Sequence, residues 1–248
     1  MARLRSLFNA LAVAQFCYAE VAIPKSAGYT ALSAPKMIKG ANDFKMWEFD
    51  RGVNCDPSKE YDDSASTFIL EDGASISNVI FGTKQISGVF CLGSCTLTNV
   101  WFRSVCDEAV QVYGKGNALI VGGGANNAPN KFVQHDGSGT VTIRGGEYYG
   151  ISHLYRSCGN CPNNKEHSPR QVIIQNNKIH NVKNDVAGIN PNFGDTAQIE
   201  NNCGENIASI CQPYTGMEGS SHGRSLKSTN KNSCHGGQGM ATKFPACS

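Results

Sequence analysis

The chain has 248 residues, of which 40% are hydrophobic and only 17% are charged. This length and apolar content suffice for one substantial folded domain and exclude an intrinsically disordered protein. The sequence contains 27 glycines and has asparagines throughout, and both residue types favour turns and loops, so the composition argues against a mainly helical protein.

The first 19 residues have the layout of a secretory signal peptide. Arg3 and Arg5 form a basic start, an apolar run extends from Leu7 to Phe16, and Ala19 is a small residue suited to cleavage. The run is shorter than the roughly 20 residues that span a bilayer, and an ordinary N-terminal helix is the weaker alternative. Removal of the leader takes away both arginines and leaves equal numbers of basic and acidic side chains. We therefore predict a secreted, extracellular protein with no membrane or nucleic-acid partner.

Ten cysteines remain in the mature chain, because Cys17 lies in the leader. An even number of cysteines in an exported chain is typical of disulfides, up to five here, and the sequence leaves their pairing open. Cys158 and Cys161 form a CxxC within the stretch SHLYRSCGNC. A zinc site needs a second ligand pair at suitable spacing, and a redox CxxC needs an α/β context. We therefore expect both cysteines to be oxidised anchors, not necessarily bonded to each other.

Short β-rich runs recur at intervals of 21 to 31 residues. One predicted strand per repeat of this length indicates a solenoid, in which each coil buries its apolar face against its neighbours. An antiparallel sandwich is the alternative, but hairpin dipeptides such as Asn-Gly are scarce between the runs. We predict an all-β, single-domain parallel β-helix (a β-solenoid) with disulfide-pinned loops. The runs are Ser75–Phe81, Thr96–Phe102, Ala118–Gly123, Thr140–Gly146, Gln171–Asn177 and Ala197–Asn202.

Asparagines occupy matching positions in these runs. Asn78 matches Asn99, and Asn176 matches Asn201, so each pair is expected to form a ladder at a turn. The longest interval holds an excursion from about residue 155 to residue 170. From about residue 215 the chain is an irregular tail, which Cys234 and Cys247 would tie down. No linker divides residues 20–248, and we predict one domain.

Charged residues follow three successive runs. Asp107 and Glu108 come after the second run, Lys131 after the third and Arg156 after the fourth. Coil stacking would bring them to one face in steps of about 4.8 Å. Adjacent carboxylates could hold Ca²⁺, which prefers oxygen ligands. On these residues alone, unrelated surface charges remain the simpler interpretation.

A family resemblance favours the first interpretation. The chain resembles the small secreted pectate lyases of polysaccharide lyase family 3 in pieces that run in family order from about Phe68 to Gly216. The resemblance implies a right-handed parallel β-helix that acts as a monomer. It also implies an enzyme that uses Ca²⁺ to cleave polygalacturonate, the pectin of plant cell walls, by β-elimination. The matching pieces are GVFCLGSCTLTNVWF, VCDEAVQV, GGGANNAPNKFVQHDGSGTV, LYRSCGNC, GINPNFGDTA and CQPYTG.

The resemblance also implies roles for single residues. Lys131 matches the base that removes the C5 proton, and lysine can serve if a nearby cation lowers its pKa. Arg156 matches the cation that grips the substrate carboxylate with its two-pronged donor geometry. Asp107 and Glu108 match the acidic pair associated with Ca²⁺. The candidate substrate-binding residues are Asn130, Gln134 and Tyr155.

The chain departs from the family's pattern where acids are usual. Ser87 stands before Gly-Val, Arg103 and Ser104 replace an acidic pair, and Asn130 replaces an aspartate. The resemblance therefore implies a Ca²⁺ site with fewer carboxylates and weaker affinity. A second hypothesis is a catalytically impaired lyase fold that binds pectin, a host wall component or a receptor.

Overall fold

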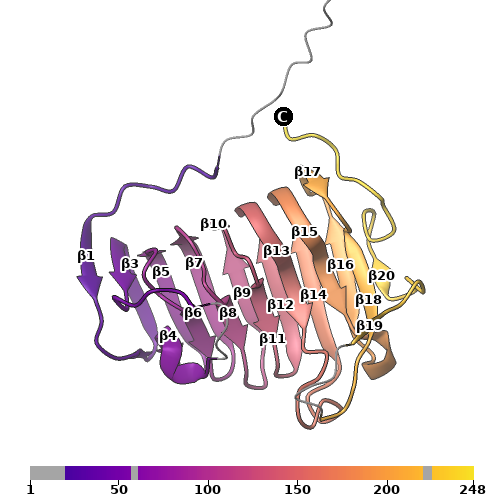
Figure 1. The fold of residues 1–248 in the computed structure, drawn as a ribbon, viewed down its shortest axis with the longest axis horizontal. Helices are drawn as coiled ribbons and strands as arrows, with labels where there is room; N and C mark the ends of the chain where they lie inside the picture. Colours follow the sequence, from indigo (N-terminus) through magenta and orange to yellow (C-terminus); the bar gives the residue numbers. More distant parts are fainter. Residues whose placement is uncertain (1–19, 57–60, 220–224) are drawn as a thin grey trace, which may run out of the picture.

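The computed structural model describes residues 20–56, 61–219 and 225–248, so the predicted signal peptide lies outside the described residues. The chain winds into a stack of coils whose strands pair with those of the next coil (Figure 1). The pairings are parallel, except that β18 pairs with β19 in antiparallel fashion. This confirms the predicted parallel β-helix and excludes the sandwich. Among the described residues no helix is long and apolar enough to cross a membrane.

The parallel pairings form three series, and bent strands carry the chain from one series to the next. We call the series that carries the candidate site sheet 1. Sheet 1 consists of β2 (Lys36–Ile38), β4 (Ser66–Leu70), β6 (Ser87–Cys91), β8 (Glu108–Val112), β11 (Lys131–His135), the last parts of β13 (Glu147–Ser157) and β15 (Lys178–Ile189), and β18 (Cys211–Thr215).

The other two series close the coil. Sheet 2 consists of the first parts of β3 (Ala41–Asp50), β5 (Ala74–Phe81) and β7 (Cys95–Phe102), followed by β9 (Ala118–Val121), β12 (Gly139–Arg144), β14 (Arg170–Gln175), β16 (Thr196–Glu200) and β20 (Cys234–His235). Sheet 3 consists of β1 (Gly28–Ala31), the last parts of β3, β5 and β7, then β10 (Gly124–Asn126), the first parts of β13 and β15, and β17 (Cys203–Ile207). The remaining elements are β19 (Leu226–Lys227) and the short 3-10 helices η1 (Asp63–Ala65) and η2 (Pro191–Phe193).

The six predicted runs correspond to strands of sheet 2, namely β5, β7, β9, β12, β14 and β16. The runs identified one strand in each repeat, and most coils also contribute strands to sheets 1 and 3. Those strands are short or carry polar and charged side chains outward, so they lack the β-branched runs that identify sheet 2. The predicted excursion also begins later, since Tyr155 and Arg156 belong to β13 and the loop starts at Cys158.

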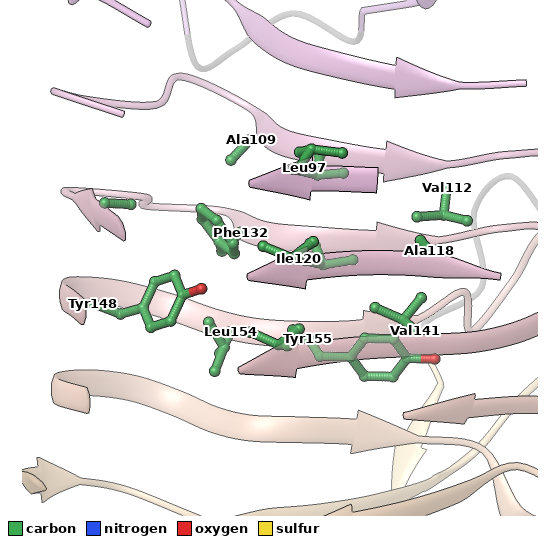
Figure 2. Packing of buried hydrophobic residues seen from close by; sticks show 14 of the residues in the cluster. Leu97, Ala109, Val112, Ala118, Ile120, Phe132, Val141, Tyr148, Leu154 and Tyr155 are labelled. Carbon is green, nitrogen blue, oxygen red and sulfur yellow. The ribbon is translucent and has the colours of Figure 1, made fainter. Parts of the chain in front are cut away.

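Aromatic rings form a column inside the coils. Seven rings contact one another in sequence with centroids 4.8–5.5 Å apart, which matches the spacing of successive coils. Figure 2 shows Phe132 and Tyr148 of this column among the aliphatic side chains of the core. The stack therefore fixes the register of the coils that present the candidate site. The seven residues are Phe44, Phe49, Phe68, Phe81, Phe102, Phe132 and Tyr148.

Asparagine ladders hold the bend between sheets 2 and 3. The Asn99 side chain donates to Asn78 Oδ1 at 2.8 Å, which confirms the first predicted ladder, and both residues adopt the left-handed conformation that asparagine tolerates. The second ladder joins Asn177 to Asn202 at 2.9 Å, one residue beyond the predicted pair. The predicted pair instead takes the left-handed corner positions.

All ten cysteines of the predicted mature chain are paired. Cys158 and Cys161 bond to each other, which settles the pairing that the sequence left open. The tail is tied down at Cys234 and Cys247, as predicted. The five disulfides are Cys55–Cys106, Cys91–Cys95, Cys158–Cys161, Cys203–Cys247 and Cys211–Cys234.

Candidate active site

The outward face of sheet 1 carries two rows of polar side chains. In the first row, strand pairing places Glu108 beside Lys131 and Lys131 beside His153. The second row lies three residues further along the strands and places Gln134 beside Arg156. The parallel coils thus gather residues from distant parts of the sequence on one face.

The first row contains what we call the carboxylate–lysine cluster, formed by Asp107, Glu108, Asn130 and Lys131. Lys131 Nζ lies 3.0 Å from Glu108 Oε1. The Asn130 amide donates to Asp107 Oδ1 at 2.6 Å and lies 3.4 Å from Glu108 Oε1. The structure therefore brings together the predicted base, the predicted metal-binding pair and one predicted substrate-binding residue.

Glu108 is the most perturbed acid of this cluster. Burial raises the pKa of Glu108 to about 7, and the adjacent Asp107 carboxylate adds to the rise. Lys131 opposes the shift by stabilising the charged carboxylate, but it does not cancel the effect of burial. Two neighbouring carboxylates with little water around them are an arrangement that a bound cation would stabilise.

The cluster fits Ca²⁺ in its donor chemistry. Asp107 and Glu108 supply carboxylate oxygens, and the Asn130 amide can rotate to present Oδ1 in place of its nitrogen. Serine replaces two of the other expected acids: Ser87 is buried in β6, and the Ser104 carbonyl accepts a hydrogen bond from the Gln85 side chain. The residues therefore fit a cation site with few carboxylates.

Arg103 does not add an unbalanced positive charge to this region. Its Nε and Nη2 atoms each lie 3.0 Å from one carboxylate oxygen of Glu48, in the bidentate geometry that arginine favours. The side chain of Glu48 is 13% exposed, so the pair is largely shielded from solvent. Glu48 thus neutralises the positive charge of Arg103, the arginine that stands where the family pattern has an acid.

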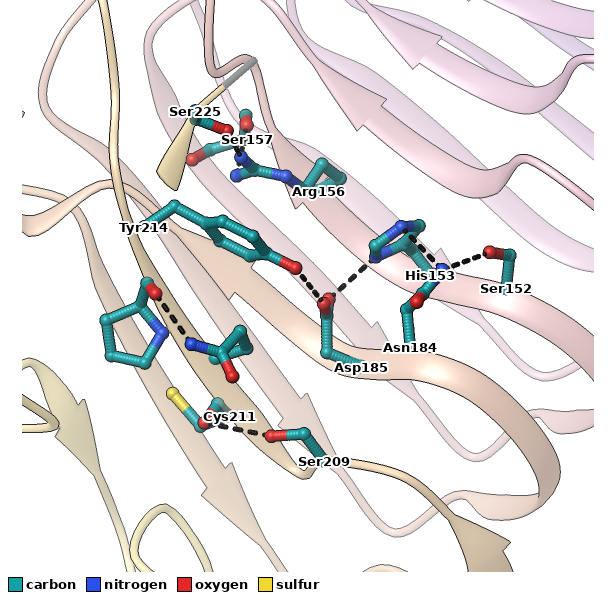
Figure 3. A network of polar contacts seen from close by, with 12 residues as sticks. Ser152, His153, Arg156, Ser157, Asn184, Asp185, Ser209, Cys211, Tyr214 and Ser225 are labelled. Atoms are coloured by element: carbon teal, nitrogen blue, oxygen red, sulfur yellow. Dashed lines mark hydrogen bonds and ion pairs between the residues drawn. The ribbon is translucent and has the colours of Figure 1, made fainter. Parts of the chain in front are cut away.

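Arg156 lies at the end of β13 in a second cluster, drawn in Figure 3. Its guanidinium sits 4.0 Å over the Tyr214 ring. Nη1 donates to the Ser157 carbonyl at 2.7 Å and to Asn190 Oδ1 at 3.2 Å, and Nη2 donates to Ser225 Oγ at 2.6 Å. Among the described residues, Nε–H and one Nη2–H have no acceptor. The arginine is therefore held rigidly and keeps two donors for a ligand.

Asp185 joins this cluster to the first row. Its carboxylate accepts from His153 Nδ1 at 2.9 Å and from the Tyr214 hydroxyl at 2.7 Å, and it is fully buried. Burial lowers the pKa of Arg156, and Asp185 opposes that shift. We call Arg156, Asp185, Asn190, Tyr214 and Ser225 the arginine cluster. Asp185, Tyr214 and His153 were not predicted, because they follow no charge motif and meet only through strand pairing.

Two glycines make room for the arginine. A Cβ atom on Gly188 would lie 2.7 Å from Arg156 Cδ and 3.2 Å from Tyr214 Cε2, so a side chain there would separate the stacked pair. A Cβ atom on Gly159 would lie 2.8 Å from Arg156 Nη2. Gly159 lies between Cys158 and Cys161, so the disulfide loop closes directly against the guanidinium.

The remaining predicted residues have different environments. Gln134 donates to Asp136 Oδ1 at 2.6 Å, and its buried Oε1 has no partner within the described part of the chain. Tyr155 is a core residue: it is fully buried and its hydroxyl lies 2.8 Å from His135 Nδ1. The prediction that Tyr155 contacts substrate is therefore corrected, because its side chain points into the coil.

One group of potential metal ligands lies beside the loop. Asp136 approaches the sulfurs of Cys158 and Cys161, with all ligand atoms within 4.8 Å of one another. Both sulfurs are consumed in a disulfide, so they are not thiolates and cannot act as zinc ligands. The CxxC is a covalent closure of the loop.

Comparison with known proteins gives consistent matches. A sequence model of the family described as pectate lyase matches residues 20–221. The probable pectate lyase E of Aspergillus clavatus is 42% identical over 196 residues, which cover 78% of this chain and 75% of the relative. Pectate lyase E of Emericella nidulans is 41% identical over 213 residues, which cover 85% of this chain and 82% of the relative.

Solved structures have the same architecture. Pectate lyase Pel3 from Pectobacterium carotovorum matches with a TM-score of 0.69 and 25% identity over 84% of this chain and 67% of its own. Pectate lyase PelI from Erwinia chrysanthemi, solved in complex with tetragalacturonic acid, matches with a TM-score of 0.58 and 25% identity over 77% of this chain and 62% of its own.

Proposed function

This chain belongs to the pectate lyase family, and from that premise we propose that it is a secreted enzyme that cleaves α-1,4-linked galacturonan by Ca²⁺-dependent β-elimination. The observation that carries the proposal is the face of sheet 1, where Lys131, two carboxylates and Arg156 lie on neighbouring strands. Five disulfides support an extracellular location. The lyase domain is proposed to span residues 20–248, with the tail beginning at about 215.

Arg156 binds the carboxylate of the galacturonate that reacts. Its stacking on Tyr214 and its bonds to Ser157 and Asn190 fix the guanidinium before substrate arrives. The remaining Nε–H and Nη2–H are charge-assisted donors suited to a carboxylate. As the C5 proton leaves, negative charge moves onto this carboxylate, and a preorganised cation stabilises that charge in the transition state.

Lys131 takes the proton from C5. The electron pair of the C–H bond forms the C4–C5 double bond. The C4–O bond to the neighbouring sugar breaks, its electron pair stays on the departing oxygen, and that oxygen takes up a proton from solvent water. Strand spacing puts the Cα atoms of Lys131 and Arg156 about 11 Å apart, a gap that two long side chains can bridge from either side of one sugar ring. Lys131 must leave its contact with Glu108 Oε1, 3.0 Å away, before Nζ can reach the C5 proton.

Asp107, Glu108 and Asn130 are the residues that would hold Ca²⁺. When bound, the ion would neutralise charge on the uronate carboxylate. Because Ser87 and Ser104 replace acids, the ion would be held by fewer carboxylates. The cationic side chains of the protein would then have to neutralise more of the charge on the uronate carboxylate.

The test is a lyase assay on polygalacturonate at alkaline pH, in which absorbance follows the unsaturated product. We expect activity that rises with added Ca²⁺ and disappears with a chelator. A folded β protein, verified by circular dichroism, that gives no product at high enzyme and millimolar Ca²⁺ would exclude the proposal.

A second candidate function is a catalytically impaired lyase fold that binds pectin, a host wall component or a receptor. The Glu108–Lys131 pair favours it, because a base engaged by a carboxylate and a metal site short of acids both reduce turnover. This candidate predicts that the protein retains pectate in a sedimentation assay and releases no unsaturated product. Turnover at ordinary enzyme rates would exclude it.

A further inference from the structure

A cavity of about 230 Å³ lies beside the carboxylate–lysine cluster, and we call it the corner groove. Its lining comes from successive coils, so the groove runs along the axis of the β-helix. Cys106 and Pro129 of the lining directly precede Asp107 and Asn130, which places the groove next to the candidate site. The lining residues are Cys55, Thr83, Ser104, Val105, Cys106, Asn127, Pro129, Gly150 and Lys183.

Among the described residues of that lining, Lys183 is the charged one and none is acidic. Its side chain is exposed, and it has no hydrogen bond or ion pair within the parts of the chain that the structure describes. Its neighbours have other partners: Asn184 donates to Ser152 Oγ at 2.8 Å, and Asp185 is buried between His153 and Tyr214. The groove therefore offers a cation whose charge is not neutralised locally.

An irregularity in the strand pairing accounts for the position of Lys183. Ile151 pairs with Val182 and His153 pairs with Asp185, so three steps along β15 oppose two steps along β13. The extra residue on β15 makes a bulge at Lys183 and Asn184. Bulges of this kind occur beside active sites, where they redirect a side chain. The bulge thus places a lysine in a groove whose other lining is uncharged.

We propose that Lys183 binds the carboxylate of a second galacturonate, next to the sugar that reacts at Lys131, and that the corner groove is its subsite. The inference rests on the proposed function, because it takes the ligand to be a polyuronate. Every sugar of such a chain carries a carboxylate, and the uncharged lining of the groove makes Lys183 its ionic contact. A methyl-esterified sugar has no charge to pair, so the groove discriminates in favour of de-esterified substrate.

The experiment measures binding without turnover. In the Lys131→Ala background with Ca²⁺ present, isothermal titration calorimetry gives the Kd of tetragalacturonate and of its methyl-esterified form. Addition of Lys183→Ala is expected to weaken tetragalacturonate binding about five- to tenfold and to leave the binding of the ester unchanged. The control is Lys115→Ala, an exposed lysine on the turn after β8, which should change Kd less than twofold. Lys183→Arg should restore binding, and raised salt should reduce the effect of Lys183→Ala.

The outcomes separate this inference from the proposed function. If the background protein binds tetragalacturonate and Lys183→Ala has no more effect than Lys115→Ala, the subsite is excluded while the lyase proposal stands. An equal loss for the acid and the ester also excludes it, because the contact would not depend on charge. If the background protein binds neither ligand, both proposals fail.

Discussion

The two clusters on sheet 1 differ in how firmly they are held. In the arginine cluster, Arg156 is 7% exposed and has three hydrogen bonds and a stacked ring, while Asp185 is fully buried. In the carboxylate–lysine cluster, the side chain of Lys131 is 23% exposed and forms an ion pair with Glu108. One cluster is fixed by its surroundings, and the other can exchange its partners.

This difference matches the role proposed for each cluster. A group that stabilises developing charge gains from being fixed in advance, because no reorganisation is then needed during the reaction. A group that takes up a proton or a metal must change its contacts. The comparison predicts that substitutions in the arginine cluster affect stability and activity together, whereas those in the carboxylate–lysine cluster affect activity with little effect on folding.

The largest effect is expected for Lys131→Ala. Loss of a general base should lower kcat by about a thousandfold, while the melting temperature changes little because Lys131 is partly exposed. Lys178→Ala is the matched control, since Lys178 also forms an ion pair, with Glu147, but on sheet 3. Initial rates on polygalacturonate give the answer. A variant that keeps a tenth of the wild-type rate would rule out Lys131 as the base.

Arg156→Lys should lower kcat/KM by about a hundredfold, because lysine keeps the charge and loses the planar fork. It should also lower the melting temperature, since lysine cannot bond Ser157 and Asn190 while stacking on Tyr214. Thermal unfolding and rates measured on the same preparations check both effects. Loss of activity with unchanged stability would contradict the idea that this cluster is the firmly held one.

Tyr214→Phe separates positioning from contact within the arginine cluster. The ring stays under Arg156, but its hydrogen bond to Asp185 is lost. We expect a five- to tenfold loss in kcat/KM and a decrease of about 1 kcal/mol in the free energy of unfolding. A loss as large as that of Arg156→Lys, with stability unchanged, would mean that the hydroxyl itself contacts substrate.

The residues of the carboxylate–lysine cluster were predicted from the sequence better than those of the arginine cluster. Asp107, Glu108 and Lys131 are charged and follow strand runs, so coil stacking could bring them to one face, and the family resemblance favoured that interpretation over unrelated surface charges. Asp185 and Tyr214 meet only because β15 and β18 pair in a register that no local pattern reveals. The fold was predicted from sheet 2, whose strands alternate regularly.

Tyr155 shows why neighbours in sequence do not share a role. It directly precedes Arg156, but successive residues of a strand point to opposite faces, so Tyr155 enters the core while Arg156 faces outward. The sequence interpretation placed both in a loop, where this rule does not apply. Recognition of β13 as a strand would have corrected the prediction.

Asn130→Asp tests whether the carboxylate–lysine cluster can be strengthened. A third carboxylate beside Asp107 and Glu108 should raise the affinity for Ca²⁺ about tenfold, because ligand charge tunes such sites. Calorimetric titration of Ca²⁺ into the two proteins checks this. Asn127→Asp, on the other side of Ala128 and Pro129, is the control and should have little effect. Equal affinities for the wild type and Asn130→Asp would place the ion elsewhere.

The smallest expected effect is on the pH dependence of folding stability. It concerns His135, which is buried against Tyr155 in the scaffold beneath both clusters. Burial lowers the pKa of His135 to about 3, and the Arg170 charge adds to the shift. The unfolded chain, with a histidine pKa near 6.5, takes up a proton as the pH falls below that value, whereas the folded protein does not until about pH 3. Stability is therefore complete above pH 6.5 and decreases as the pH falls from 6.5 towards 3.

Between pH 7 and pH 5.5 this linkage should cost about 1 kcal/mol, measured by urea unfolding at each pH. His135→Phe cannot titrate, so it should flatten the slope even if it lowers stability at every pH by removing the contact with Tyr155. His235→Ala, at an exposed position on β20, should leave the slope unchanged. A slope that persists in His135→Phe would assign the acid sensitivity to other groups, and Glu108 would not be among them, because its raised pKa stabilises the folded protein as the pH falls from 7.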